Sequence, residues 1–163
     1  MKRVAVILGS DSDLPVLEGA FQTLRSLEVP FEAHVFSAHR TPDEAAAFAK
    51  SARENGFGVL IAAAGMAAHL AGALAARTTL PVIGVPVAGR RFDGMDALLS
   101  TVQMPSGIPV AAVAVDGAKN AALLAAEILS VAEPALAEKL ETLREEQRRA
   151  VLEKDEKLTA DLR

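Results

Sequence analysis

The chain has 163 residues, of which 51% are hydrophobic and 23% charged, a balance typical of one compact globular domain and opposite to that of a disordered chain. Its formal net charge of −4 argues against a nucleic-acid-binding surface, which needs clustered Lys and Arg. It contains no cysteine, so disulfides, thiolate metal sites and cysteine nucleophiles are excluded, and we expect a reducing, cytoplasmic location. The first apolar run stops at Leu8, before Asp11 and Asp13, and we therefore expect no export signal and no membrane span.

Short apolar runs alternate with segments of helical period, the pattern of β-α-β units in a parallel sheet covered by helices on both faces. The pattern predicts five strands, at Val4–Leu8, Phe31–Phe36, Val59–Ala63, Val82–Val85 and Val110–Val115. It predicts helices at Leu14–Leu27, Pro42–Asn55, Ala67–Arg77, Gly94–Val102 and Ala118–Ala132. Thr41 suits the N-cap of the second helix, Pro42 its first turn, and Gly56 a left-handed C-cap after it.

Residues 1–133 form the predicted α/β domain, and past Pro134 the sequence changes to one charged helix. An apolar stripe runs along this helix through Leu136, Leu140, Leu143, Val151 and Leu152. The five strands already have enough helices to cover them, so we expect the stripe to have no cover within one subunit. Because a leucine stripe left in water is an exposed apolar patch, we interpret residues 134–163 as an arm that packs on a neighbouring subunit rather than as a solvated tail.

Ligands of a doubly wound sheet bind beyond the carboxyl ends of the strands, so the loops after the strands are the places for a site. The loop from Gly9 to Asp13 offers a glycine turn, two hydroxyls and free helix amides, all suited to a phosphate. A carboxylate beside a phosphate repels it, so we expect Asp13, rather than Asp11, to turn away and accept hydrogen bonds from ribose hydroxyls. The alternative is that these Ser and Asp residues only cap the first helix.

The loops after the second and third strands carry two of the three histidines. In the segment Ser37 to Pro42, His39 adjoins Arg40, which places a group that titrates near neutral pH beside a permanent cation whose fork matches phosphate oxygens. The segment Ala64 to Gly72 is a tight glycine turn whose backbone can approach a ligand closely. His69 falls near the first turn of the helix that follows, where the dipole favours a neutral imidazole, and it is either a structural tie between loops or a catalytic residue.

Two further segments are interpreted as walls of the site: Pro86 to Gly94, which carries Arg90 and Arg91, and Val102 to Pro109, a rigid turn that could close over a ligand. Asp116, Lys119 and Asn120 open the next helix and are interpreted as caps, and His34 as a partly exposed polar residue within a strand. The dinucleotide, P-loop and nucleophile-elbow motifs are missing from the sequence. The histidines are spread over different segments, which predicts no metal site.

Four segments that fall in these loops closely resemble, in order and spacing, the N5-carboxyaminoimidazole ribonucleotide mutase family of purine biosynthesis. They are Gly9–Asp13, Ser37–Pro42, Ala67–Leu70 and Gln103–Pro109, and the likeness covers about residues 3 to 155. The resemblance implies a three-layer α/β/α sandwich of the flavodoxin type with a five-stranded parallel sheet and an extra C-terminal helix. It also implies a homo-octamer with active sites between subunits, a ribonucleotide substrate, and no cofactor.

The reaction implied by the resemblance moves a carboxylate from the exocyclic nitrogen to the ring carbon of the ribonucleotide, by decarboxylation and recarboxylation. His39 matches the catalytic histidine of the family, and Ser10, Asp13 and Arg40 match its substrate-binding positions. The expected site therefore has His39 and His69 as catalytic residues. Its expected substrate-binding residues are Gly9, Ser10, Ser12, Asp13, Ser37, Ala38, Arg40, Ala64, Gly65 and Leu70.

The third loop departs from the family pattern, with Ala63, Met66 and Ala71 in place of two glycines and a proline. Met66 would narrow the pocket expected to hold CO2 and would restrict torsions open to Gly. One alternative is the sister carboxylase that uses free CO2, which resembles Ser-Ala-His-Lys where this chain has Ser37 to Arg40 and lacks Ala-Ala-His-Leu, so the mutase is favoured. The other is a non-catalytic nucleotide-binding module in which His39 only donates a hydrogen bond.

Overall fold

The computed structural model describes residues 1–162 and contains one parallel sheet with the strand order β2-β1-β3-β4-β5. Its strands are β1 (Arg3–Leu8), β2 (Phe31–Val35), β3 (Phe57–Gly65), β4 (Val82–Val87) and β5 (Ala111–Ala112). Its helices are η1 (Asp11–Asp13), α1 (Leu14–Ser26), α2 (Pro42–Ser51), α3 (Leu70–Ala75), α4 (Met95–Val102), α5 (Ala118–Ser130) and α6 (Pro134–Asp161). This strand order is that of flavodoxin-like doubly wound folds, which confirms the predicted class.

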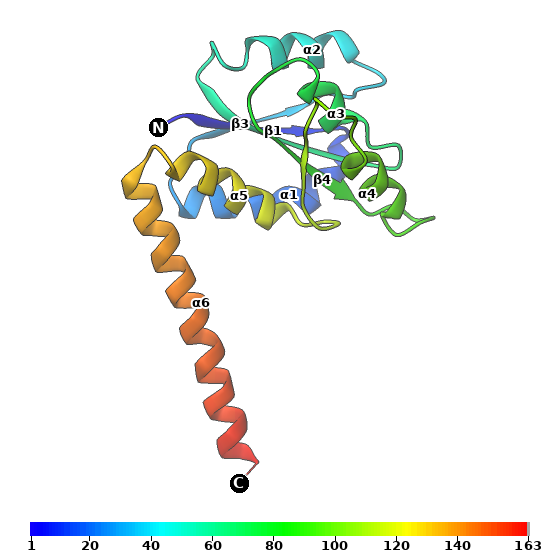
Figure 1. Cartoon of the computed structure of the whole chain (residues 1–163). Coiled ribbons are helices and arrows are strands. Elements are labelled where there is room, and N and C mark those ends of the chain that lie inside the picture. The colour runs from blue at the N-terminus through cyan, green and yellow to red at the C-terminus, as the bar shows by residue number, and fades with distance from the viewer. Residues whose placement is uncertain (163) are drawn as a thin grey trace.

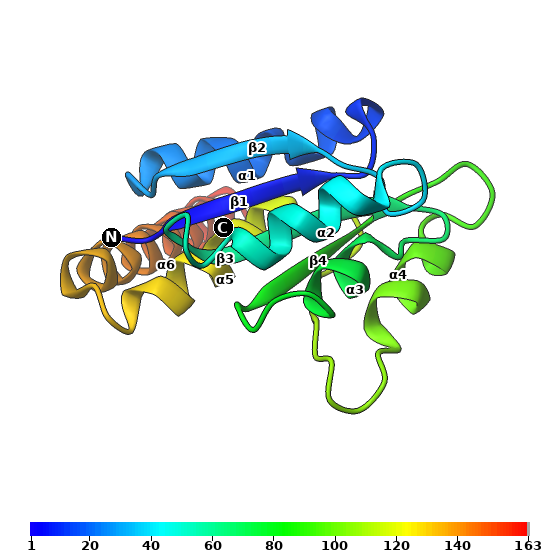
Figure 2. The same ribbon diagram turned by 90° about the horizontal axis from the view of Figure 1, so that it is seen from above.

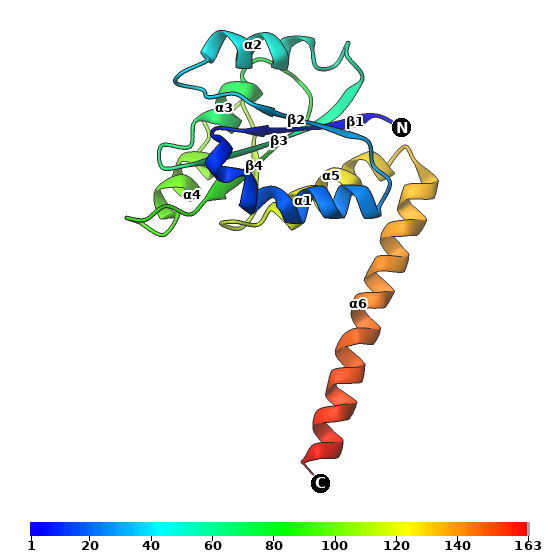
Figure 3. The same cartoon turned by 180° about the vertical axis from the view of Figure 1, so that it is seen from behind.

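Two hydrophobic clusters, one on each face of the sheet, hold the three layers together. β1 alternates between them: Val4 and Val6 pack with residues of α1 and α5, whereas Ala5 and Ile7 pack with residues of α2 and α3. Figure 1 shows α2 and α3 above the sheet and α1 and α5 below it, and Figure 3 shows the same layers from behind. Seen from above, the strands run in one direction, so their carboxyl ends meet at one edge (Figure 2).

Several predicted helix ends are wrong. α2 ends at Ser51 rather than Asn55, with Ala52 in a right-handed conformation as its C-cap. Gly56 has the predicted left-handed φ of +86°, but it ends the turn that follows the helix and does not cap it. α3 covers only Leu70–Ala75 rather than Ala67–Arg77, since residues before Leu70 form a separate turn. Pro42 opens α2 as predicted. Thr41 occupies the N-cap position, but its hydroxyl bonds the backbone of Ser37 instead of capping the helix.

The prediction of a full fifth strand is also wrong, because β5 pairs with β4 only over Ala111–Ala112 and not over Val110–Val115. The Val113 N–H still donates to the Gly84 carbonyl at 3.1 Å. The next hydrogen bond of a parallel ladder would need an N–H at position 86, and Pro86 has none. Pro86 in β4 thus ends the pairing of β5, which begins some 25 residues later in the sequence.

The C-terminal helix α6 extends away from the body of the molecule (Figures 1 and 3). Leu136 is buried in the core cluster of the α1 and α5 face and Leu140 packs against that cluster, so the expectation that the stripe has no cover within one subunit is wrong for its first part. Val151 and Leu152 are exposed. Arg163, the last residue of the predicted arm, lies outside the described residues. Among residues 1–162, no helix is both long enough and apolar enough to cross a membrane.

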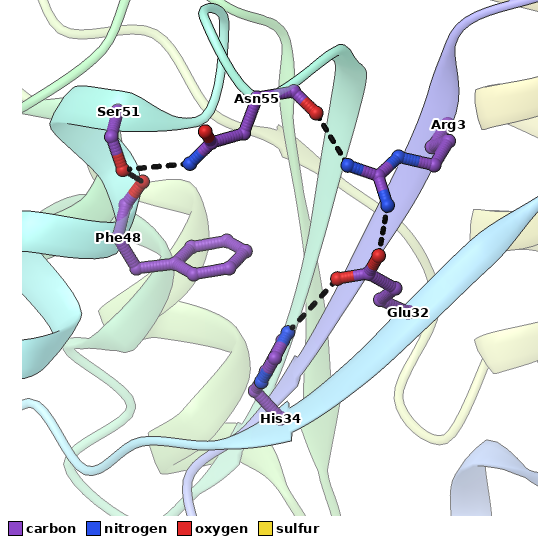
Figure 4. Close-up of polar contacts among 6 residues, drawn as sticks. All are labelled: Arg3, Glu32, His34, Phe48, Ser51 and Asn55. Carbon is purple, nitrogen blue, oxygen red and sulfur yellow. Dashed lines mark hydrogen bonds and ion pairs between the residues drawn. The ribbon is translucent and has the colours of Figure 1, made fainter.

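A polar network joins the amino end of β1 to its neighbours (Figure 4). The Arg3 guanidinium donates to the Glu32 carboxylate of β2 and to the Asn55 carbonyl beyond α2. His34 Nε2 lies 3.6 Å from Glu32 Oε2, and the imidazole packs against the ring of Phe48. His34 is thus half-buried, as predicted, and it supports the edge strand of the sheet.

Gly84 shows how closely the helices approach the sheet. An added Cβ there would lie 2.3 Å from Thr101 Cγ2 of α4 and 3.2 Å from Ala71 Cβ of α3. Gly84→Ala should therefore lower the free energy of unfolding by about 1–3 kcal/mol through overpacking, measured by urea denaturation. Gly89→Ala is the control, because a Cβ at Gly89 would meet no atom of residues 1–162 within 4 Å. Equal stability of the Gly84 variant and the unmodified protein would contradict this account of the packing.

Candidate active site

A cavity of about 530 Å³ lies where the loops after β1, β2, β3 and β4 meet. This is the edge at which the chain order reverses between β1 and β3, the position where doubly wound folds bind ligands. The structure brings all the predicted site residues to it: Gly9, Ser10, Ser12, Asp13, Ser37, Ala38, His39, Arg40, Ala64, Gly65, His69 and Leu70. Met66, Ala67, Val87, Ala88 and Gly89 complete the lining.

The turn after β1 is organised by the Ser10 hydroxyl. Ser10 Oγ accepts hydrogen bonds from the Ser12 amide at 3.3 Å and from the Ser12 hydroxyl at 2.9 Å, so it caps η1. Residues of the same turn line the cavity, so the turn both caps η1 and belongs to the candidate site. Asp13 lines the cavity, whereas Asp11 is exposed and lies outside the lining given above. Burial raises the pKa of the Asp13 carboxyl above its ordinary value, which the Ser12 hydroxyl partly opposes.

The turn after β2 is held by the hydroxyl groups of Ser37, predicted as a substrate-binding residue, and Thr41, predicted as a helix cap. Ser37 Oγ accepts from the amides of His39 at 3.3 Å and Arg40 at 3.2 Å, while Thr41 Oγ1 accepts from the Ser37 amide at 2.8 Å. The Arg40 guanidinium donates to the Gly9 carbonyl at 3.3 Å, which joins this turn to the end of β1. Arg40 has four further N–H donors, so this bond leaves most of its fork for an anion.

The two histidines of the site are in direct contact. His39 Nε2 lies 2.8 Å from His69 Nδ1, and the rings meet edge to face with their centroids 5.0 Å apart. A hydrogen bond between two imidazole nitrogens needs a proton on one and a lone pair on the other. The pair therefore shares a proton across this contact, and the loops after β2 and β3 are tied together through it. Such a tie between loops is one of the two roles predicted for His69, although the separation of 30 residues did not identify His39 as its partner.

The turn after β3 contains a strained residue. Met66 has φ = +54°, in the left-handed region that favours glycine, and its side chain is exposed at the cavity. At the preceding Gly65 an added Cβ would lie 3.2 Å from the Val87 carbonyl oxygen, so the ends of β3 and β4 approach closely. The departure of Met66 from the family pattern thus falls where the backbone conformation itself calls for glycine.

Of the two predicted walls, one lines the cavity and the other does not. The Pro86 to Gly94 segment lines it through Val87, Ala88 and Gly89, with Arg90 and Arg91 exposed outside that lining. The other predicted wall, Val102 to Pro109, is wrong, because its Gly107, Ile108 and Pro109 line another groove, beside Leu80 to Val82 at the amino end of β4. A segment that precedes a parallel strand reaches the opposite edge of the sheet from the site, so within one chain this turn cannot close over the cavity.

The interpretation of Asp116, Lys119 and Asn120 as helix caps is also wrong. Gly117, which has no side chain, occupies the N-cap position of α5. Lys119 and Asn120 lie in the first turn of α5, on a groove between α5 and α6. The Asp116 carboxylate accepts a hydrogen bond from the Ala88 amide at 2.9 Å, and so serves the loop after β4 instead of the helix.

The fold and the cavity define a doubly wound α/β protein with a polar ligand site at its topological switch point. A model of the AIR carboxylase family matches residues 3–150. The N5-carboxyaminoimidazole ribonucleotide mutase of Pyrococcus abyssi is 56% identical over 149 residues, which covers 91% of this chain and 86% of that protein. The Bacillus subtilis protein of the same name is 52% identical over 157 residues, with coverage of 95% and 97%. The crystal structure of Treponema denticola PurE superimposes with a TM-score of 0.87 at 29% identity, with coverage of 95% and 97%. The chain belongs to the AIR carboxylase family.

The left-handed position of Met66 generates a stability prediction. A left-handed conformation costs a non-glycine residue about 1–2 kcal/mol, and the greater entropy of glycine in the unfolded chain offsets part of the relief. Met66→Gly should therefore raise the free energy of unfolding by up to about 1 kcal/mol. Met66→Ala is the matched control, since it removes the same thioether but keeps the Cβ and the strain. A glycine variant no more stable than the alanine variant in urea denaturation would refute the strain.

Proposed function

We propose that this chain is an N5-carboxyaminoimidazole ribonucleotide mutase, an isomerase of purine biosynthesis that forms 4-carboxy-5-aminoimidazole ribonucleotide without a cofactor. The observation that carries the proposal is the His39–His69 pair, which shares one cavity with Arg40 and the Ser10 turn. Support comes from mutase relatives more than half identical over nine-tenths of the chain. The segments Ser37–Arg40 and Ala67–Leu70 favour the mutase over the direct carboxylase, and the His39–His69 contact favours an enzyme over a non-catalytic module.

Charge decides how the ribonucleotide lies in the cavity. The free N–H donors of Arg40, with the Ser10 and Ser12 hydroxyls, take the phosphate, because a guanidinium fork matches its oxygens. The ribose hydroxyls donate to the Asp13 carboxyl, which lines the cavity beside this turn. The imidazole base then extends toward the His39–His69 pair and the turn after β3.

The reaction needs one proton delivered and one removed. The bond between the exocyclic nitrogen and the carboxylate breaks, CO2 leaves, and His39 gives a proton to that nitrogen. The ring carbon then attacks CO2, a carbon–carbon bond forms, and His39 takes the proton that the carbon loses. His39 ends in its starting state, and an imidazole suits both steps because its ring nitrogens can both donate and accept a proton. His69, hydrogen-bonded to His39 Nε2, orients the ring and shares its proton.

The cavity also has to retain CO2 between the two steps. Ala64, Leu70 and backbone groups line it at the end of β3, and the sequence places no Lys between Ala64 and Leu70. Such a surface accommodates a neutral linear molecule but offers bicarbonate no cation of its own, because Arg40 is engaged by the phosphate. The CO2 released in the first step is therefore used in the second.

Incubation of the purified protein with the N5-carboxylated substrate in labelled bicarbonate tests the proposal. We expect conversion to the 4-carboxylated isomer with little label in the product, and carboxylation of aminoimidazole ribonucleotide only at high bicarbonate. Full exchange of label during a single conversion would favour the direct carboxylase. Binding of the ribonucleotide without conversion would favour the non-catalytic module.

His39→Asn separates catalysis from binding. Asparagine keeps hydrogen-bonding capacity but has no titratable nitrogen, so turnover should fall by about 10²–10⁴-fold, the usual contribution of one acid–base group. The dissociation constant of the ribonucleotide, measured by calorimetry, should change by only a few-fold. Turnover within a few-fold of that of the unmodified protein would exclude His39 as the proton carrier.

We further propose that the protein works in the cytoplasm as a homo-octamer with sites between subunits, and that the distal part of α6 packs on a neighbouring subunit. Val151, Leu152 and Leu158 are exposed along it, and an apolar row on a projecting helix favours burial against another chain. Truncation after Arg144 keeps Leu136 and Leu140 in their own core and removes only the exposed part. The mass of the assembly by light scattering should fall, and an unchanged mass would refute the arm.

A further inference from the structure

The part of the cavity wall that follows β4 lies beyond the reach of β5. Residues Val87, Ala88 and Gly89 line the cavity, whereas β5 pairs with β4 only at Ile83 and Gly84. Pro86 stands between the two regions and has no N–H with which to continue the ladder. β3 holds the end of β4 on one side, through the pairing of Gly65 with Val87, so only on the β5 side must something other than a regular strand hold it.

Asp116 does so with two hydrogen bonds. Its amide donates to the Pro86 carbonyl at 2.9 Å, and its carboxylate Oδ1 accepts from the Ala88 amide at 2.9 Å. In a parallel ladder one residue of the neighbouring strand gives its N–H to one residue and accepts from the residue two further on. Asp116 reproduces this pattern with its side chain in place of its carbonyl.

The backbone conformation of Asp116 explains the substitution of side chain for carbonyl. Asp116 has φ = +56°, and its carbonyl accepts from the Ala118 amide at 2.9 Å as the chain turns into α5. The carbonyl is therefore committed to the start of the helix, and the carboxylate is left to bond Ala88. Asp and Asn tolerate this left-handed conformation better than most residues.

The same connection closes the base of the loop after β4. At Gly94, where the loop returns, an added Cβ would lie 2.5 Å from Val115 Cγ1 and 3.2 Å from the Ala88 Cα. The two ends of the loop thus pack against each other and against the residue that precedes Asp116. Because Gly65 in turn approaches the Val87 carbonyl, a shift of Ala88 would open the cavity on the side next to the Met66 turn.

We infer that Asp116 is a positioning residue, whose carboxylate holds Ala88 and Gly89 as the wall that keeps released CO2 and aminoimidazole ribonucleotide in the cavity. The identity of the retained molecules rests on the proposed function. The means of their retention rests on the Asp116–Ala88 hydrogen bond. Loss of the acceptor should loosen the wall and let the intermediates escape, while the proton-carrying pair on the other loops is left in place.

Two substitutions in the full chain separate the hydrogen bond from the backbone conformation. Asp116→Gly adopts a left-handed conformation freely but removes the acceptor, whereas Asp116→Asn keeps both an Oδ1 acceptor and tolerance of that conformation. The measured quantities are the free aminoimidazole ribonucleotide released per turnover, the incorporation of labelled bicarbonate, kcat and KM.

We expect the glycine variant to release about ten- to a hundredfold more free aminoimidazole ribonucleotide per turnover, the factor that corresponds to one lost hydrogen bond to a charged group. Label in the product should rise with it, and the asparagine variant should stay within a few-fold of the unmodified protein, because its neutral Oδ1 still accepts the hydrogen bond. Equal release by the glycine variant and the unmodified protein would overturn the inference. Equal impairment of both variants would also overturn it, because the role would then belong to the charge.

Hydrogen exchange of the peptide from Pro86 to Phe92 tests the contact without reliance on activity or on the folding of the glycine variant. The Ala88 amide should exchange at least about tenfold more slowly than in an unstructured peptide, in both the unmodified protein and the asparagine variant. Unprotected exchange in the unmodified protein would overturn the inference. Absence of conversion by the unmodified protein, with the Ala88 amide protected, would count against the proposed function and leave the positioning contact standing.

Discussion

The parallel direction of every strand is the constraint on which the site depends. Hydrogen bonding between parallel strands forces each connection to cross back over a face of the sheet, so the loops that follow the strands share one edge. Segments as far apart in sequence as Gly9, Arg40, His69 and Ala88 therefore line one cavity. The same constraint sends the Gln103 to Pro109 turn, which precedes a strand, to the opposite edge. The resemblance of that turn to a family motif indicates which family the chain belongs to, but the direction of the strands decides at which edge of the sheet the turn lies.

Much of the fold was predictable because its determinants are local. Alternation of apolar runs with helical periods indicates a parallel sheet, and polar residues directly after strands indicate the edge of the site. What could not be predicted depends on partners remote in sequence. The length of β5 is decided by Pro86 on another strand, and the cover of Leu136 by a core cluster built largely from β1, β3, α1 and α5. The contact between His39 and His69 likewise exists only once two loops are brought together.

The chemistry of the cavity follows from how its charges are shared. The His39–His69 hydrogen bond lets the change of charge that comes with a transferred proton be shared by two imidazoles instead of resting on one ring. Arg40 is itself fixed by the Gly9 carbonyl, which keeps the cation at the turn with the serine hydroxyls. His39 and Arg40 adjoin in sequence, yet they are bonded to different loops, His39 to His69 and Arg40 to Gly9. In the function that we propose, that division lets the phosphate stay anchored while protons move at the other end of the substrate.

The two connections that shape the cavity at β3 and β4 depend on non-glycine residues in left-handed conformations, Met66 and Asp116, with φ values of +54° and +56°. Such conformations persist only where the surrounding structure determines them, and they gather at functional sites. The two residues differ in what they gain. Asp116 uses its side chain to replace a missing rung of the sheet, so its conformation is compensated by a hydrogen bond. Met66 lines the cavity with a side chain that is 70% exposed, and a thioether has no N–H or O–H with which to compensate the conformation. Of the two connections, the one next to β4 is therefore the one fixed by hydrogen bonding, and the retention of CO2 that we propose relies on it.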